Sequence, residues 1–253
     1  MVRYVGTSNL PQLPIKNLTV SMMNFVLVAS LLGTLSVTTF TEQADAFLSD
    51  HVSDGKVDYV GIVQNRSQID KLYQQIGEMS LKGISDTEKK AFYINAYNLI
   101  TIHQITKHYP VKSPMDVKGF FDQKKHTVAG EQFTLNELEK KKLLKPYQDP
   151  RIHFVLVCAA VSCPPLADFA YRADKLDEQL DEKTREALNS NSFVRVKKDQ
   201  KKVELSKIFD WYQSDFTQNS PSLIAYVNQY RDQKIPASYQ ASHYDYDWSL
   251  NKQ

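Results

Sequence analysis

The stretch between Ala91 and Ile105 constrains the fold of this chain more than any other part of the sequence. Apolar and aromatic side chains occur there at nearly every angle around a helix axis, and a helix of this kind is buried on all sides. Ser85 and Glu88 stand three residues apart just before it, which is the spacing of a capping box, and Pro110 limits the helix at its other end. The sequence therefore predicts one buried helix of roughly 24 residues, longer than most.

Two asparagines, Asn95 and Asn98, lie three residues apart and hence on one face of this predicted helix. A buried carboxamide without a hydrogen-bond partner costs about 1–3 kcal/mol, so each needs partners inside the protein. Two interpretations follow. The amides tie the helix to neighbouring loops, or they line a functional site.

Composition limits the classes of protein that this chain can represent. It has 253 residues, of which 42% are hydrophobic and 24% are charged, and this fits one compact domain with a substantial core and an appendage. Its 31 Lys and Arg residues nearly balance 29 Asp and Glu residues, and the net charge is +2. Nucleic-acid-binding domains carry a clear excess of positive charge, so we expect no nucleic-acid partner. The lysine-rich run at residues 140–145 is interpreted as the solvated face of a helix.

Residues 1–46 resemble a leader rather than part of the fold. An apolar run of 13 residues at positions 25–37 precedes a polar stretch in which Ala44 and Ala46 supply small residues at the spacing of a cleavage site. This pattern predicts a secretory signal peptide cut after Ala46 and export to the periplasm or the outside of the cell. One globular domain over residues 47–253 is then expected.

Two alternatives to a cleaved leader stay open. Little positive charge precedes the apolar run, and synthesis could begin at Met22 or Met23 instead of the first residue. The run could also be an uncleaved membrane anchor, although it is shorter than the ~20 residues that a spanning helix usually needs. In that case the leader is the only part of the chain that contacts a membrane.

The segments beyond the central helix differ in type. Residues 126–134 are predicted to form a short hairpin, and the apolar, β-branched run at 152–158 is predicted to be a buried strand. The aromatic tail at 244–251 is expected to fold back onto the core. Together these features predict an α+β fold, in which helices and a small, mostly antiparallel sheet pack around the long buried helix.

Both cysteines of the chain lie where this predicted strand ends. Pro164 favours an extended conformation for Cys163, and a helical turn starting at the prolines would favour the thiolate form of Cys163. Three interpretations stay open for the pair. Cys158 and Cys163 form a disulfide, Cys163 is a nucleophile with His153 or another histidine as its base, or both are small buried hydrophobic side chains. No histidine or second cysteine pair stands at the spacing of a zinc site, so we expect no metal and no cofactor.

Other polar side chains near the predicted strand extend the candidate site. His153 lies within an apolar run, where a histidine is either a core residue or a base that serves Cys163. Arg151 falls on the same face of the strand as His153, because side chains alternate along a strand. Asp210 and Asp215 could orient such a base or only hydrogen-bond the neighbours of their helix.

Five motifs of the chain occur in the same order in a known family. They lie at residues 91–98, 150–154, 158–166, 205–212 and 246–251. Through them the chain resembles the family catalogued as domain of unknown function 547 (DUF547), and the resemblance covers residues 47–251. The family includes many exported bacterial proteins and has no established reaction.

The resemblance also implies a distant relation to papain-like and transglutaminase-like folds. In those folds a Cys at a helix start, a His on a strand and an Asp or Asn act together. This sequence departs from that pattern, because its buried helix offers Asn95 and Asn98 where a nucleophilic Cys is expected. The departure leaves either a non-catalytic relative or a site rebuilt around Cys163.

Two functional hypotheses follow. One is an exported, thiol-dependent hydrolase or transferase that acts on peptide or amide groups, with Cys163, His153 and Asn95 as catalytic residues. In this hypothesis Asn98 and Arg151 bind the substrate. The alternative is a non-catalytic binding or envelope-interaction module, in which the same residues stabilise the core and the partner is an unidentified protein.

Overall fold

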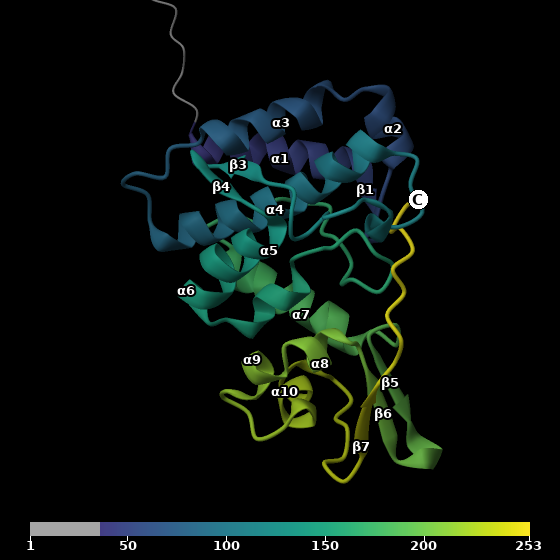
Figure 1. Cartoon of the computed structure of the whole chain (residues 1–253). Coiled ribbons are helices and arrows are strands. Elements are labelled where there is room, and N and C mark those ends of the chain that lie inside the picture. The colour runs from purple at the N-terminus through teal and green to yellow at the C-terminus, as the bar shows by residue number, and fades with distance from the viewer. Residues whose placement is uncertain (1–35) are drawn as a thin grey trace, which may run out of the picture. The chain divides into compact units, whose positions relative to one another are not determined.

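One long helix, α4 (Asp86–His108), organises the computed structural model, which describes residues 36–253 (Figure 1). Its first turn carries the predicted capping box. The Ser85 hydroxyl accepts from the backbone N–H of Glu88, and the Glu88 carboxylate accepts from the N–H of Ser85. Every side chain from Ala91 to Thr106 is buried. The predicted position and all-round burial of this helix are therefore confirmed.

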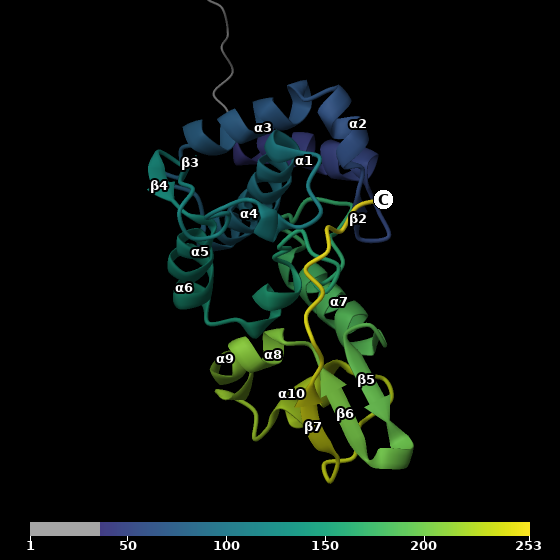
Figure 2. The same cartoon turned by 45° about the vertical axis from the view of Figure 1, so that its right-hand side comes forward.

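Three helices pack against α4 at one end of the described region (Figures 1 and 2). They are α1 (Val37–His51), α2 (Tyr59–Gln64) and α3 (Ser67–Glu78). Aromatic and aliphatic side chains fill the space between them, and the ring centroids of Phe40 in α1 and Phe92 in α4 are 5.4 Å apart. This group supplies much of the larger of two hydrophobic cores.

A second, smaller core lies at the other end, against a three-stranded sheet. In this sheet β5 (Val194–Lys197) runs antiparallel to β6 (Lys202–Leu205), which runs parallel to β7 (Gln240–His243). The predicted hairpin at residues 126–134 is also present, so the predicted α+β class is confirmed. The remaining elements are β1 (Val52–Ser53), β2 (Lys56–Val57), β3 (His126–Val128), β4 (Glu131–Phe133), α5 (Leu135–Leu138), α6 (Lys145–Tyr147), α7 (Leu176–Asn189), α8 (Ile208–Trp211), α9 (Gln213–Thr217) and α10 (Leu223–Tyr230).

The tail after β7 returns from the sheet to the end formed by α1 to α4 (Figure 2). It forms an isolated antiparallel bridge between Leu250 and Ala160, and the N–H of Asn251 donates to the carbonyl of Ala159 at 3.1 Å. Further on, the N–H of Val57 donates to the carbonyl of Asn251 at 3.0 Å. The tail therefore spans both cores, as its aromatic composition predicted.

The predicted strand at residues 152–158 is wrong. Residues Pro150–Phe154 form a 3₁₀ turn, in which the Asp149 side chain accepts from the backbone N–H of Arg151, and the segment that follows belongs to no sheet. Asn98 binds the backbone on both sides of Leu156, so a side chain of α4 satisfies polar groups that a neighbouring strand would otherwise satisfy. Apolar, β-branched composition predicted the burial of this segment but not its pairing.

The folded unit includes residues 37–46, which the sequence placed with the leader. Ser36 caps α1 by accepting from the N–H of Thr39, and Phe40 and Ala44 are fully buried. Cleavage after Ala46 would divide α1 and remove both side chains from the core. The cleavage site therefore stays a prediction, and the rest of the predicted leader, residues 1–35, lies outside the described residues.

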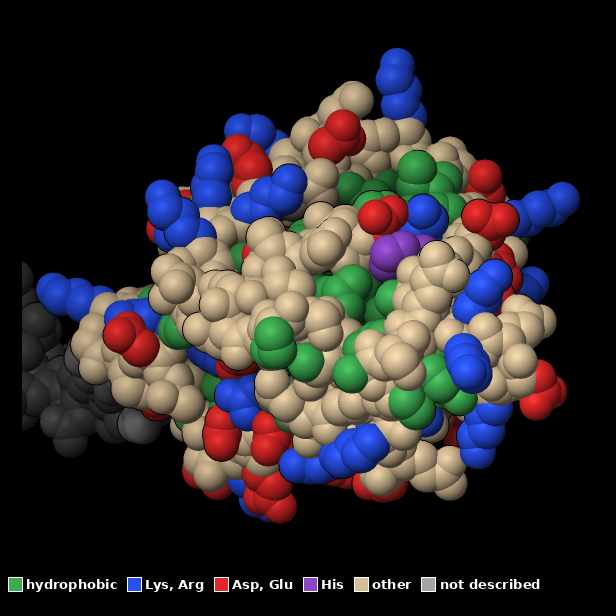
Figure 3. Space-filling model, turned by 90° about the horizontal axis from the view of Figure 1, so that it is seen from below, with side chains coloured by type: hydrophobic (Ala, Val, Ile, Leu, Met, Phe, Trp, Pro, Cys, Tyr) green, Lys and Arg blue, Asp and Glu red, His purple; other side chains and the backbone are tan. Residues whose placement is uncertain are grey.

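The surface of the described region mixes charge of both signs. On the face shown in Figure 3, hydrophobic side chains gather toward the middle, whereas Lys, Arg, Asp and Glu side chains lie mostly around the edge. Between residues 36 and 253, no helix is both long enough and apolar enough to span a membrane.

Phe40→Ala should destabilise the protein by about 3–5 kcal/mol, because it empties a fully buried ring position beside Phe92. Val60→Ala is the matched control, since Val60 is 51% exposed and its truncation should change the free energy of unfolding by less than about 0.5 kcal/mol. Denaturant unfolding of both variants measures the difference. Equal stability of the two variants would show that α1 is not part of the folded unit.

Candidate functional site

A cleft of ≈ 290 Å³ opens where the two cores meet. Its lining comes from α4, from the segments around residues 139 and 153, from the cysteine loop, from α8 and from the tail. Three large aromatic side chains form one wall, and three groups capable of acid–base or thiol chemistry face the same space. The aromatic residues are Trp211, Tyr246 and Trp248, and the reactive groups are Glu139, His153 and Cys158.

Glu139 is a buried carboxyl group at the cleft. It starts a π-helical segment (Glu139–Leu144) that joins α5 to α6, and such segments are rare and occur often at functional sites. Only 8% of the residue is exposed, and the Tyr212 hydroxyl donates to Oε1 at 2.7 Å. Burial raises the pKa of the Glu139 carboxyl, and the Tyr212 hydrogen bond and the charge of His153 oppose this only in part. Glu139 therefore holds its proton to a higher pH than an ordinary glutamate.

His153 lies beside Glu139 and is oriented by a second carboxylate. Its Nε2 is 2.9 Å from Oδ2 of Asp215, and its ring centroid is 4.2 Å from that of Tyr212. The hydrogen bond from His153 outweighs the effect of burial and lowers the pKa of Asp215. In the tautomer that donates from Nε2, the lone pair is on Nδ1, which makes no hydrogen bond to any residue between 36 and 253. His153 can therefore accept a proton on the nitrogen that Asp215 does not hold.

The two cysteines form a disulfide, which is one of the three interpretations of the sequence. Cys158 borders the cleft, whereas Cys163 is 8% exposed. Among the described residues, no histidine nitrogen lies within hydrogen-bond distance of either sulfur atom. A nucleophilic Cys163 paired with His153 would thus require both reduction and a rearrangement.

Asn95 does not reach the cleft. It is 1% exposed, and its carboxamide is fully paired with the backbone of Tyr171: Nδ2 donates to the carbonyl at 2.8 Å, and Oδ1 accepts from the N–H at 2.8 Å. The structure gives Asn95 the role of tying α4 to a neighbouring loop.

Asn98 has the same kind of role closer to the site. Its Nδ2 donates to the carbonyl of Val155 at 2.8 Å, and its Oδ1 accepts from the N–H of Val157 at 2.9 Å. Asn98 therefore fixes the segment that joins His153 to Cys158. Both asparagines therefore tie α4 to neighbouring backbone segments, which is the first of the two interpretations made from the sequence.

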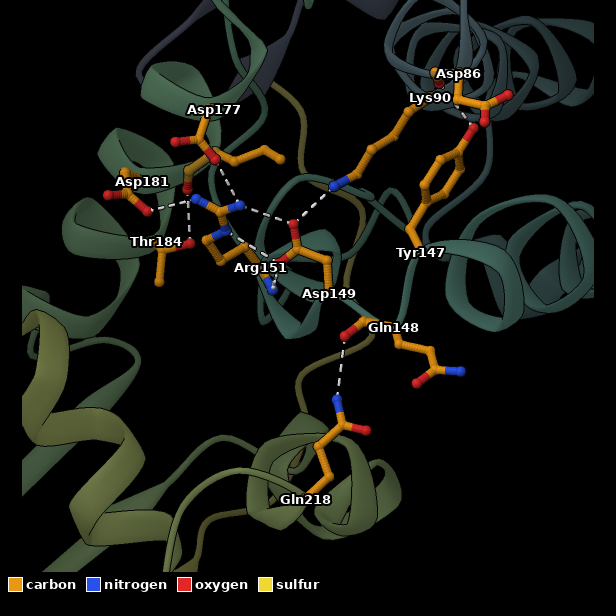
Figure 4. A network of polar contacts seen from close by, with 11 residues as sticks. Asp86, Lys90, Tyr147, Gln148, Asp149, Arg151, Asp177, Asp181, Thr184 and Gln218 are labelled. Atoms are coloured by element: carbon orange, nitrogen blue, oxygen red, sulfur yellow. Dashed lines mark hydrogen bonds and ion pairs between the residues drawn. The ribbon is translucent and has the colours of Figure 1, made fainter.

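Arg151 lies in a network of ion pairs away from the cleft lining (Figure 4). Its Nη2 is 2.9 Å from Asp149 and 2.8 Å from Asp177, and its Nη1 is 2.7 Å from Asp181. The ammonium group of Lys90 in α4 also contacts Asp149, at 2.7 Å. Arg151 therefore links the 3₁₀ turn that carries His153 to α7 and, through Asp149, to α4.

Charge in this network controls the ionisation of Asp149. Burial alone would raise its pKa, but hydrogen bonds and charge from Arg151 and Lys90 outweigh that effect and lower the pKa to about 2. Asp149 consequently stays ionised throughout the physiological pH range.

Sequence reasoning missed the carboxyl group and the aromatic wall of the cleft. Glu139 directly precedes the lysine-rich run at residues 140–145. Because that run was interpreted as a solvated face, a buried glutamate was not expected beside it. Trp211 and Tyr212 lie in the motif at residues 205–212, which supported the family resemblance but was not assigned to the site. Asp215 was considered as a partner for a base, but its pairing with His153 joins residues 62 positions apart. Within residues 36–253, no group of three or more His, Cys, Asp or Glu side chains is placed to hold a metal ion.

Comparison with known proteins identifies one family. The family described as "Protein of unknown function, DUF547" matches residues 81–188 and confirms the resemblance seen in the motifs. The matched region contains Glu139, His153 and both cysteines, whereas Tyr212 and Asp215 follow it. No curated protein and no solved structure matches the chain, and the relation to papain-like folds stays a prediction.

Asn98→Leu should lower the free energy of unfolding by about 2–4 kcal/mol, because it leaves the carbonyl of Val155 and the N–H of Val157 buried without partners. Asn191→Leu, at an exposed turn position, is the control and should change stability by less than about 0.5 kcal/mol. Chemical denaturation measures both. Similar effects of the two substitutions would contradict the role given to Asn98.

Stability should fall in acid as Asp149 is protonated. Its folded-state pKa of about 2 lies below the ordinary value near 3.8, so its contribution is complete above pH ~4 and is lost as the pH falls toward 2. The difference corresponds to about 2 kcal/mol. Asp149→Asn should remove this part of the pH dependence of unfolding, and Asp199→Asn, at an exposed position, should retain it. Parallel pH profiles for wild type and Asp149→Asn would contradict the assignment.

Proposed function

We propose that this chain, which carries a DUF547 region at residues 81–188, is an exported hydrolase or transferase that acts on peptide or amide groups by acid–base catalysis in the cleft. The observation that carries the proposal is the pair of carboxyl groups beside His153. Burial raises the pKa of Glu139, whereas the hydrogen bond from His153 lowers the pKa of Asp215. Two carboxyl groups with pKa values shifted in opposite directions are typical of a site that needs one proton donor and one charged partner.

The base in this proposal is His153. Asp215 accepts from Nε2 and stabilises the positive charge that the ring gains when it takes a proton. Nδ1 then removes a proton from a water molecule or hydroxyl group as that oxygen attacks a carbonyl carbon. His153 sits on a 3₁₀ turn that Asn98 and Arg151 hold in place, so the base is positioned before a substrate arrives.

The acid in this proposal is Glu139. Tyr212 occupies one oxygen of the carboxyl group, and the other oxygen, Oε2, makes no hydrogen bond to residues 36–253. A proton on Oε2 can be given to the leaving nitrogen as the carbon–nitrogen bond breaks. That bond breaks after water has added to the carbonyl carbon and given its proton to His153, so one proton is taken up at His153 and one is given to the amine. Transfer of the proton from His153 to Glu139 through solvent then restores both groups.

The aromatic wall supports a substrate with an apolar or flat group next to the scissile bond. Trp211 is 49% exposed, which is unusual for such a large side chain, and its ring centroid is 4.9 Å from Tyr246. Trp248 completes the wall at 4.7 Å from Tyr246. Rings held against each other in this way present a rigid surface for stacking at little entropic cost.

The proposed location of this protein is outside the cytosol. The disulfide supports it, because disulfides persist in oxidising compartments such as the periplasm and are rare in the cytosol.

A non-catalytic binding module is the second candidate. The exposed ring of Trp211 favours it, since an aromatic wall at a cleft can hold a ligand without any proton transfer. In this case Glu139 and His153 would contribute to the stability of the protein and would catalyse no reaction.

A panel of peptide nitroanilides with aromatic side chains tests the proposal. Glu139→Gln and His153→Gln should each lower turnover by about 10²–10⁴-fold, because each removes a proton donor or acceptor from the transition state. In the wild type, turnover should also fall as the pH rises through the raised pKa of Glu139, since the acid then loses its proton. Glu178→Gln and His108→Gln, at exposed positions outside the cleft, are the matched controls.

Binding of the same peptides separates the two candidates. Quenching of tryptophan fluorescence without turnover, lost in Trp211→Ala, would support the binding module and reject the enzyme. Turnover that both cleft variants retain at the wild-type level would reject the assigned acid and base.

A further inference from the structure

The two sulfur atoms of the disulfide lie in unlike environments. Cys158 borders the cleft and is partly exposed, whereas Cys163 is buried behind it. The Sγ of Cys163 accepts from the N–H of Cys158 at 3.0 Å and from the N–H of Ala160 at 3.4 Å. The Tyr246 hydroxyl lies 3.3 Å from the same sulfur and 3.1 Å from the Sγ of Cys158. Two backbone donors therefore serve only the sulfur that a reagent in the cleft reaches less easily, and the Tyr246 hydroxyl can donate to either sulfur.

We propose that the Cys158–Cys163 disulfide undergoes thiol–disulfide exchange with a thiol that enters the cleft, with Cys158 as the attacked sulfur and Cys163 as the leaving group. This reaction is additional to the acid–base chemistry proposed above and does not depend on it. The reacting partner is a cysteine-bearing peptide or a small organic thiol, because both fit a cleft of this size.

The hydrogen bonds explain which sulfur leaves. A thiolate is stabilised by donors directed at it, and a better stabilised thiolate leaves faster from a disulfide. Two backbone N–H groups already point at the Sγ of Cys163 in the oxidised protein, and the Tyr246 hydroxyl lies within reach of both sulfur atoms. Among the described residues, no backbone N–H donates to the Sγ of Cys158, whose polar contact is with that hydroxyl. Charge that develops on Cys163 during exchange is therefore compensated by groups that do not need to move.

The exchange balances as two displacement steps. The thiolate of the substrate attacks the Sγ of Cys158, the bond between the cysteines breaks, and its electron pair stays on Cys163. The product is a mixed disulfide at Cys158. A second thiolate, on the same peptide or on a second thiol molecule, then attacks the substrate sulfur of that mixed disulfide and expels Cys158 as a thiolate. The substrate loses two electrons and gains a disulfide, and the protein gains two electrons as a dithiol.

The backbone around the cysteines keeps both sulfurs in place during these steps. The N–H of Val161 donates to the carbonyl of Ser249 at 2.8 Å, and the N–H of Ser162 donates to the carbonyl of Asp247 at 3.1 Å. Asn98 holds Val157 immediately before the first cysteine. Cys163 therefore stays beside the mixed disulfide, where it can also reverse the first step.

Partial reduction of the full-length oxidised protein with glutathione tests the assignment of the two sulfurs. The reaction is stopped with acid, free thiols are blocked with a maleimide, and the cysteine peptides are mapped by mass spectrometry. We expect glutathione on Cys158 and maleimide on Cys163, in excess of the opposite pattern by about tenfold or more. An equal mixture, or glutathione mainly on Cys163, would overturn the proposal.

Single-cysteine variants give an independent test. Cys163→Ala should form a lasting mixed disulfide with oxidised glutathione at Cys158 under native conditions, whereas Cys158→Ala should react at Cys163 only after unfolding. Circular dichroism checks that both variants are folded. A disulfide that glutathione opens in the wild type only on unfolding, together with an unreactive Cys158 in Cys163→Ala, would show a purely structural crosslink.

Tyr246→Phe tests the role of the hydroxyl donor. It should slow the exchange of the wild-type disulfide with glutathione by about threefold to tenfold, which is the range expected for one hydrogen bond. Tyr239→Phe is the matched control, since the Tyr239 hydroxyl donates to the carbonyl of Lys198 and Tyr239 does not line the cleft. Exchange as fast in Tyr246→Phe as in the control would remove Tyr246 from the mechanism.

Discussion

The site depends on a buried carboxamide that replaces a neighbouring strand. Polar backbone groups in a protein interior must be paired, and an irregular segment normally runs over the surface for that reason. Asn98 supplies both a donor and an acceptor to the segment between Val155 and Val157, and Asn95 does the same for Tyr171. Irregular backbone can therefore cross the interior next to α4. His153 precedes one such segment and Cys158 follows it. The hydrogen bonds of Asn98 therefore hold both residues in place relative to α4.

The electrostatic character of the cleft follows from where the two cores meet. Glu139 is buried and, within residues 36–253, accepts one side-chain hydrogen bond, from Tyr212, so its charged form is poorly solvated. Asp215 lies on a short helix of the smaller core with its side chain 36% exposed, and His153 donates to it. His153 thus lies between Glu139, whose pKa is raised, and Asp215, whose pKa is lowered. The difference follows from the burial of Glu139 and from the hydrogen bond between His153 and Asp215.

Much of the scaffold could be predicted from local sequence, and much of the site could not. The capping box at Ser85, the stop before Pro110 and the all-round apolar pattern of α4 are local signals, and all three are confirmed. The segment at 152–158 carries a strand-like pattern, but strand formation needs a partner, and the pattern says nothing of Asn98 in another element. Glu139 was hidden for a related reason. Its burial depends on Tyr212, 73 positions later, and periodicity within one helix does not report such a contact. The order of the motifs identified the family, whose model matches residues 81–188. The aromatic wall and Asp215 lie beyond the matched region.

The returning tail fixes the order in which the site can be assembled during protein synthesis. Tyr246 and Trp248 close the cleft, and the backbone of this tail pairs with the cysteine loop and with β2. These partners are separated in sequence by roughly 90 to 190 residues, so the contacts are among the most non-local in the fold and close last. A ribosome-bound chain that has not yet released Trp248 can form α4 and its surrounding helices but lacks one wall of the cleft. The cleft is therefore incomplete until the wall residues have been synthesised and have packed against the cysteine loop.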